Sequence, residues 1–222
     1  PRRARTRRFS LHSRLALTTT VVLLGGGALL FAAMEPHRAE HSLFMSAAAR
    51  TAGFDTTSVS ELSSGALMTL MLLMFIGASP GSTGGGIKTT TLALMILLVV
   101  SILKGRERVT VHGREIPRDL LRRMFAVFVS ALLVVVTGIF AIVVLEGVDK
   151  LRFLPLAFEV VSAFGTVGLS TGITPDLAVP SKILLCVIMF IGRVGSLSLF
   201  LVLVREETAS HVRYPEERVM IG

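Results

Sequence analysis

The sequence predicts an all-α membrane protein, and three observations lead to this fold class. The chain of 222 residues is 52% hydrophobic, and its mean hydropathy of +0.73 exceeds that of ordinary soluble domains. Uncharged runs of bilayer length recur along it. A short Thr-x-Gly segment occurs twice, beginning at Thr51 and at Thr166, 115 positions apart. Membrane helices arranged in two similar units account for all three.

Four membrane-crossing units are expected from the apolar runs. The first, Leu15–Met34, is uncharged over about 20 residues, roughly 30 Å as a helix, which matches a bilayer core. The second, Leu62–Leu103, is interrupted by a glycine-rich stretch, and the third is Met124–Leu145. The fourth, Ser181–Val204, has Arg193 near its middle.

Basic residues gather in two segments, before the first span and in the connection 104–123 between spans two and three. The two remaining connections carry slightly more acid than base. By the positive-inside rule, the N-terminus, the loop 104–123 and the C-terminal tail lie in the cytoplasm of a multi-pass protein of the cell membrane. The formal net charge of +8 is explained by this distribution, so it does not indicate nucleic-acid binding.

The offset of 115 residues divides the chain into two parallel helix–pore loop–helix repeats, since both start and finish inside. We expect a basic cytoplasmic lead-in over 1–14, a first unit over 15–103, a cytoplasmic loop over 104–123, a second unit over 124–204 and a cytoplasmic tail over 205–222. The second helix of the first repeat is broken by a glycine-rich intramembrane loop. Short helices near Ser42–Ala49 and Leu154–Phe164 cannot cross a membrane, so re-entrant loops are expected. Ordinary surface loops are the alternative.

The paired turns suit cation binding, because successive backbone carbonyls can replace the hydration shell of a dehydrated ion. Gly53 and Gly168 permit the required backbone geometry, and the hydroxyls of Thr51 and Thr166 add oxygens at the inner mouth. We expect the side chain after each glycine to pack against its short helix. The candidate ion-binding (filter) residues, and the only ones expected to hold potassium, are Thr51, Ala52, Gly53, Phe54, Thr166, Val167, Gly168 and Leu169.

The stretch Ala78–Gly86 contains one proline, four glycines and three hydroxyl side chains, and so breaks the second span. We interpret it as a flexible gate just below the filter. Two alternatives are a close-packing site for helices and a phosphate-binding loop, which Gly81–Thr89 approaches with one residue too many and no preceding strand. The candidate gate residues are Ala78, Ser79, Pro80, Gly81, Ser82, Thr83, Gly84, Gly85, Gly86, Lys88 and Arg193.

A charge within a membrane span faces a cavity or a partner. Arg193 stands opposite Ala78 by the 115-residue offset. We therefore expect its guanidinium to obstruct the pathway and to pair with carbonyls of the loop, an ion pair with an acid outside this chain being the alternative. Glu159 is expected either to buttress the second filter turn or to face outward. No arrangement of nucleophile and base stands out, so no enzyme is expected.

With these residues in view, the chain resembles the Trk/Ktr/HKT superfamily of potassium transporter membrane subunits, and is KtrB/TrkH-like. The resemblance is carried by Thr166-Val167-Gly168-Leu169, by its looser copy Thr51-Ala52-Gly53-Phe54, by the segment 77–88 and by Ile191-Gly192-Arg193-Val194. It implies a potassium translocator with four helix–pore loop–helix units around one pathway. This chain, which starts at Pro1 within a basic cluster, matches only the third and fourth of them. A missing amino-terminal half or a second copy is therefore expected.

The resemblance also implies partners, namely a homodimer of membrane subunits and a cytosolic regulatory ring of the KtrA/TrkA type. Any nucleotide cofactor then belongs to that ring, and this chain binds none. The lipid bilayer is the other partner. Two alternatives to the uptake subunit remain open, a two-repeat potassium channel that pairs as a dimer and a membrane scaffold that transports nothing.

Overall fold

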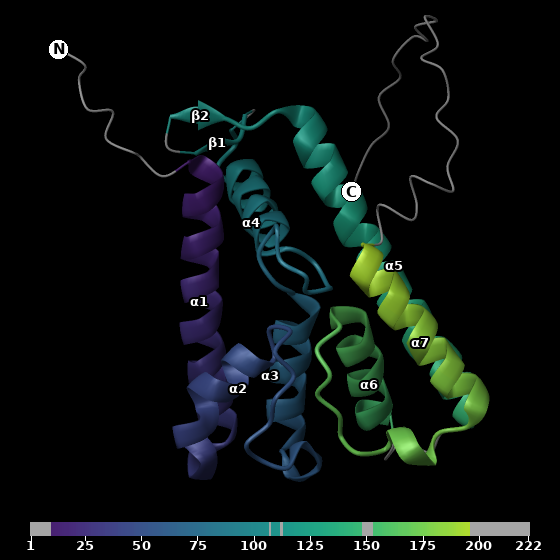
Figure 1. Ribbon diagram of the computed structural model, residues 1–222. Coiled ribbons are helices and arrows are strands. Elements are labelled where there is room, and N and C mark those ends of the chain that lie inside the picture. The colour runs from purple at the N-terminus through teal and green to yellow at the C-terminus, as the bar shows by residue number, and fades with distance from the viewer. Residues whose placement is uncertain (1–9, 107, 112, 148–152, 196–222) are drawn as a thin grey trace, which may run out of the picture.

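The protein is described from a computed structural model, which covers residues 10–106, 108–111, 113–147 and 153–195. The described part is mostly helical, and its long helices run between the same two ends of the molecule (Figure 1). The expected lead-in up to residue 9, the end of the last span and the tail 205–222 lie outside the described residues.

The first half contains helices α1 Leu11–Met34, α2 Ser42–Ala48, α3 Ser64–Phe75 and α4 Thr89–Leu103. Helix α1 begins four residues before the apolar run because the Ser10 hydroxyl accepts a hydrogen bond from the backbone amide of Ser13 and so caps it. The predicted second span is two helices, since the chain leaves the helical conformation after Phe75 and resumes it only at Thr89. The break is wider than the glycine-rich stretch itself.

Ser63 ties the C-terminal end of α1 to the N-terminal end of α3. Its hydroxyl accepts a hydrogen bond from the Ala66 amide and caps α3. Its own amide donates to Oε1 of Glu35 at 2.6 Å. This hydrogen bond lowers the pKa of the Glu35 carboxyl, since it favours the ionised form.

The second half contains a two-stranded hairpin, β1 Thr110–Val111 and β2 Arg114–Glu115, and helices α5 Arg118–Glu146, α6 Phe153–Gly165 and α7 Val179–Val194. The antiparallel hairpin departs from the expected all-α fold. Strands of two residues leave no readable alternation of polar and apolar residues, which is why hydropathy alone did not indicate them. They lie where the cytoplasmic loop 104–123 was expected.

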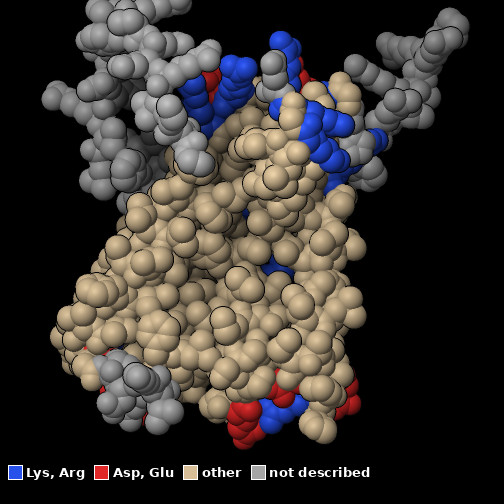
Figure 2. All heavy atoms as spheres, turned by 180° about the vertical axis from the view of Figure 1, so that it is seen from behind, with Lys and Arg blue, Asp and Glu red and all other residues tan. Residues whose placement is uncertain are grey.

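Helices α1 and α5 are each long and apolar enough to cross a membrane. A broad, mostly uncharged band, in which only small areas of Lys or Arg show, separates the two ends of the molecule (Figure 2). Lysine and arginine dominate the end that carries the β-hairpin, and acidic residues gather at the opposite end. This distribution matches the bilayer between two aqueous faces.

The two halves place their elements at the same spacing. Helices α3 and α7 begin 115 positions apart, and the residue before each has nearly the same backbone angles. Short 3₁₀ turns precede them at Val59–Glu61 and Thr174–Asp176, again 115 positions apart. The offset that relates the two Thr-x-Gly segments in the sequence therefore also relates elements of the fold.

The halves meet where α3 packs against α6 and α4 packs against α5. The Phe75 ring lies between those of Phe128 and Phe164, at centroid distances of 6.2 and 5.9 Å. Helix α7 approaches the end of α6 so closely that a Cβ at Gly192 would lie 1.9 Å from the carbonyl oxygen of Phe164. This packing brings the ends of both short helices, α2 and α6, to the middle of the molecule.

Candidate functional site

The two Thr-x-Gly turns share one backbone conformation. Thr51 and Thr166 have positive φ angles of 71° and 51°, and Gly53 and Gly168 have 73° and 97°. Positive φ is rare for a β-branched residue, and such strain concentrates at functional sites. Both turns therefore have a positive φ at the threonine and at the glycine, a structural similarity that the sequence alone did not predict.

Each turn begins where a short helix ends. The carbonyl of Ala48 accepts hydrogen bonds from the amides of Ala52 and Gly53, both at 3.1 Å. In the second turn the amide of Val167 donates to the carbonyl of Ser162 at 3.0 Å. The negative ends of both helix dipoles therefore point toward the turns, which favours a cation beside them.

The two turns touch each other. A Cβ at Gly53 would lie 2.1 Å from the carbonyl oxygen of Val167, so only glycine fits there. An ideal Cβ at Gly168 would lie 4.0 Å from the Cα of Gly53. Segments that are more than a hundred residues apart in the sequence thus lie side by side.

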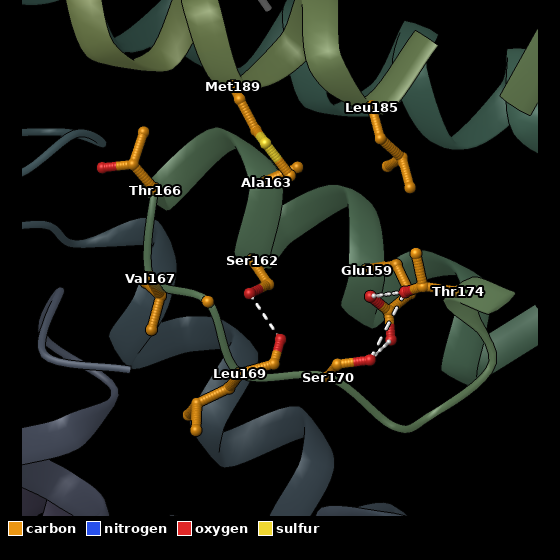
Figure 3. A pocket seen from close by; sticks show the side chains of 11 residues that line it. Glu159, Ser162, Ala163, Thr166, Val167, Leu169, Ser170, Thr174, Leu185 and Met189 are labelled. Atoms are coloured by element: carbon orange, nitrogen blue, oxygen red, sulfur yellow. Dashed lines mark hydrogen bonds between the residues drawn. The ribbon is translucent and has the colours of Figure 1, made fainter. Parts of the chain in front are cut away.

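The side chains after the glycines differ. Leu169 is buried, as expected for packing against its short helix, whereas Phe54 is 71% exposed. The expectation that Phe54 packs against its short helix is wrong for the described part of the chain, because its side chain is exposed there. The Leu169 carbonyl accepts a hydrogen bond from the Ser162 hydroxyl at 2.6 Å, which turns it toward α6 (Figure 3).

Glu159 supports the chain that follows the second turn. Of its two expected roles, this arrangement agrees with a supporting one and not with an outward-facing carboxylate. The carboxylate is buried and accepts from the Ser170 hydroxyl at 2.8 Å and the Thr174 hydroxyl at 2.9 Å (Figure 3). The amide and hydroxyl of Thr171 donate to it at 2.8 and 3.0 Å. Four donors satisfy the buried charge and hold residues 170–174 against α6.

A pocket of about 330 Å³ lies between α6, the second turn and α7. Thr166 and Ser162 line it from one side, and Leu185 and Met189 of α7 line the other (Figure 3). The second turn therefore has one face against the first turn and another on this pocket.

The glycine-rich segment forms a closed loop between α3 and α4. At its base the amide of Ile87 donates to the carbonyl of Phe75 at 3.1 Å. A Cβ at Gly77 would lie 1.9 Å from the carbonyl oxygen of Gly85, so backbone lies directly on backbone. Because a helix precedes the loop, the strand that a phosphate-binding loop requires is absent here.

The C-terminal limb of this loop, which includes Gly84 and Gly85, lies against both turns. The amide of Gly85 donates to Oγ1 of Thr166 at 2.8 Å. A Cβ at Gly84 would lie 2.6 Å from Oγ1 of Thr51. The ammonium group of Lys88 donates to the carbonyl of Gly84. The structure thus brings the candidate filter threonines and the candidate gate loop into direct contact.

Ser79 attaches the other limb of the loop to the helices. Its hydroxyl lies 3.2 Å from those of Thr20 in α1 and Thr89 at the start of α4. The carbonyl of Ser79 accepts from the Ser82 hydroxyl at 2.6 Å. Thr20 also accepts, through its carbonyl, from the guanidinium of Arg50 at 3.3 Å.

Arg50 was not among the predicted site residues, although it is half-buried immediately before the first turn. The signal that could have found it is a charge inside an otherwise uncharged short helix and turn. Gly192 was also missed, and it stands 115 positions after Gly77 within the repeated tripeptide Phe-Ile-Gly. At both glycines a backbone carbonyl oxygen lies so close that no residue with a side chain fits.

Arg193 does not pair with the loop as predicted. Among the described residues it makes no hydrogen bond with the carbonyls of Ala78–Gly86, and its side chain is exposed. The carbonyl of Gly84 instead accepts a hydrogen bond from the ammonium of Lys88, which lies just after the loop in the sequence. Arg193 is nevertheless near enough for its charge to act on that of Lys88.

The fold and the apolar band define a helical membrane protein, and comparison with known proteins gives its family. The family described as "TrkH: Cation transport protein" matches residues 13–213. The chain therefore belongs to the TrkH family of cation transport proteins.

Individual relatives agree with this assignment. The chain is 44% identical over 182 residues to Ktr system potassium uptake protein D of Bacillus subtilis, covering 82% of this chain and 40% of that protein. It is 38% identical over 232 residues to potassium/sodium uptake protein NtpJ of Enterococcus hirae, covering 98% and 51%. The chain thus spans about half the length of these relatives or less.

A solved structure shows the same fold. The potassium transporter TrkH from Vibrio parahaemolyticus superposes with a TM-score of 0.68 at 24% identity. The match covers 87% of this chain and 44% of that one. At this level of identity the likeness concerns the fold.

Proposed function

We propose that the chain is part of the membrane subunit of a Trk/Ktr-type potassium uptake system, in which it supplies two of the units that surround the ion pathway. The observation that carries the proposal is the pair of touching Thr-x-Gly turns with matching positive φ angles at the ends of α2 and α6. Relatives named as potassium uptake proteins support the choice of ion.

In this proposal the two halves are parallel helix–pore loop–helix repeats in the cell membrane. The shared 115-residue spacing of helix starts, 3₁₀ turns and Thr-x-Gly turns supports the repeat. The basic end with the β-hairpin faces the cytoplasm, in keeping with the positive-inside rule. Two turns cannot encircle an ion, so a further half or a second copy completes the ring.

The bound and transported ion is potassium at the eight filter residues, with carbonyls as its principal ligands. The glycine-rich loop with Lys88 forms the gate below, and Arg193 adds positive charge at its depth. A homodimer of membrane subunits and a cytosolic regulatory ring that carries any nucleotide complete the system. Sodium is the second candidate ion, because one relative is named a potassium/sodium uptake protein.

The test is uptake of rubidium, a potassium substitute, into proteoliposomes that contain the full-length protein, with and without sodium. Serine in place of Gly168 forces a side chain onto a φ of 97°, with its Cβ 4.0 Å from the Cα of Gly53. Such strain costs about 1–2 kcal/mol, so we expect uptake to fall about tenfold. Rubidium uptake by unmodified protein that does not exceed that of empty liposomes would contradict the proposal.

Gly172→Ser is the matched control. Gly172 also has a positive φ, 87°, and its surroundings are open, but it lies beyond the second turn. The control variant should retain uptake and the preference for rubidium over sodium. Equal losses in the two variants would mean that Gly168 matters for stability alone and has no role in the filter.

A further inference from the structure

The hydrogen bond between Gly85 and Thr166 joins the glycine-rich loop to the inner end of the second turn. The Gly85 amide donates to Oγ1 of Thr166 at 2.8 Å. A threonine hydroxyl has one hydrogen to donate and two lone pairs to accept with. In this arrangement one of those lone pairs faces an amide hydrogen, which carries partial positive charge.

The loop leaves no room for an ion at that position. A single added carbon at Gly85 would lie 2.7 Å from Oγ1 of Thr166 and 3.0 Å from the carbonyl oxygen of Gly165. One at Gly84 would lie 2.6 Å from Oγ1 of Thr51. The C-terminal limb of the loop therefore fills the space beneath both threonines.

Electrostatic repulsion disfavours a cation beneath the turns, as the close packing does. The Lys88 ammonium holds the carbonyl of Gly84, which places a full positive charge directly behind this limb of the loop. Arg193 adds a second positive charge close to the first. A cation beneath the turns would meet an amide hydrogen and two like charges, in a setting where charges are weakly screened.

We infer that the Thr166 hydroxyl is a shared acceptor, which binds either the Gly85 amide or the innermost cation of the filter. Closure of the loop and occupancy of the innermost position then exclude one another. This inference rests on the proposed function, and it adds that the transported ion itself acts on the gate. By linkage, the cation must loosen the closed loop by the same factor by which closure weakens cation binding.

The loop is built so that this contact can be released. Its base is closed by backbone contacts at Gly77 and Ile87, and its Ser79 limb is bonded to Thr20 and Thr89. Toward the tip, Ser82 is exposed and Gly81 has open space around it. The contact at Gly77 is made with Gly85 itself, so release of Gly85 from Thr166 also loosens that contact, while the hydrogen bond from Ile87 to Phe75 and the bonds of Ser79 stay in place.

The experiment measures loop release in full-length protein in nanodiscs as the rate of hydrogen–deuterium exchange in peptides that contain the Gly85 amide, which is buried and hydrogen-bonded in the closed loop. The exchange rate is followed in potassium chloride and in choline chloride of equal concentration. Potassium should raise the rate several-fold, within the range of about 5- to 150-fold typical of coupled sites. A rate that is the same in both salts would overturn the inference.

Two valine variants identify the shared acceptor. Thr166→Val keeps the β-branched shape and removes the oxygen, so the effect of potassium on the rate should disappear, and Thr166→Ser should restore it. Thr137→Val is the matched control, because it removes a hydroxyl that donates to the carbonyls of Leu133 and Val134 in its own helix α5, so the effect should persist. Loss of the effect in both valine variants would overturn the inference.

Calorimetric titration with potassium separates this inference from the proposed function. If the unmodified protein binds no potassium, the proposed function fails and the inference fails with it. If it binds potassium while the exchange rate of the Gly85 amide stays independent of the ion, the inference alone is wrong. Binding together with a potassium-dependent rate that only Thr166→Val abolishes supports both.

Discussion

Thr51 and Thr166 show at the residue scale how two segments of different sequence reach one geometry. Both are β-branched, and both hold a positive φ that such residues rarely adopt. Hydrogen bonds to the last turns of α2 and α6 and the close contact at Gly53 maintain the strained conformation. These surrounding contacts offset the free-energy cost of the backbone strain, as they do at other functional sites.

Glu159 gives a prediction at the same scale. Four hydrogen bonds reach its buried carboxylate, and hydrogen bonds to charged groups contribute about 1.5–3 kcal/mol. Glu159→Ala should therefore lower the thermal unfolding midpoint of the full-length protein by several degrees and weaken selection of rubidium over sodium. Both are measured on the same purified variant, by unfolding and by uptake in proteoliposomes.

Asp176→Asn serves as the control for Glu159. Asp176 is an exposed acid in the nearby 3₁₀ turn, so its neutralisation should change neither property. Unchanged selectivity in Glu159→Ala, with a clear loss of stability, would limit Glu159 to a structural role. No change in either property would contradict the network itself.

At the scale of elements, α1 depends on one of its three consecutive glycines. A Cβ at Gly27 would lie 2.5 Å from Oγ of Ser46 in α2 and 2.7 Å from a methyl group of Leu73 in α3. Gly25 has nothing within 4 Å. Helix α1 therefore needs glycine at position 27, where α2 and α3 converge on it.

Alanine substitutions test this contact. Overpacking costs about 1–3 kcal/mol, so Gly27→Ala should destabilise the full-length protein by roughly that amount. Gly25→Ala should be neutral or stabilise by up to about 1 kcal/mol, because alanine favours a helix over glycine. Thermal unfolding of the purified variants measures both, and equal shifts in the same direction would refute the assigned packing.

At the scale of the whole molecule, the uneven distribution of charge is the basis of the orientation that we propose in the membrane. Lys104 lies at the basic end near the β-hairpin, and Ser60 lies at the acidic end, both exposed. With a single cysteine at one of these positions in a cysteine-free full-length protein, an impermeant thiol reagent added to intact cells should label Ser60→Cys. It should reach Lys104→Cys only after the membrane is opened. The reverse pattern would invert the proposed topology.

The large-scale features were accessible from the residues alone. The apolar run from Leu15 predicted a span that is found as α1, and the short helices were expected within a few residues of α2 and α6. The β-hairpin, the exposed Phe54 and the missing bond from Arg193 to the loop were not foreseen. Each of these depends on which other element lies nearby, and hydropathy carries no such information.

Composition and spacing along the chain were sufficient to predict apolar helices, a break at Pro80 and its glycines, and two turns of one kind. These features follow from the cost of exposing polar backbone in a bilayer and from local backbone preferences, which are read residue by residue. The contact of Gly85 with Thr166 joins positions 81 residues apart. The packing of α3 against α6 and of α4 against α5 brings them together, and the sequence does not show it, because a hydrogen bond acts over about 3 Å whatever the distance along the chain.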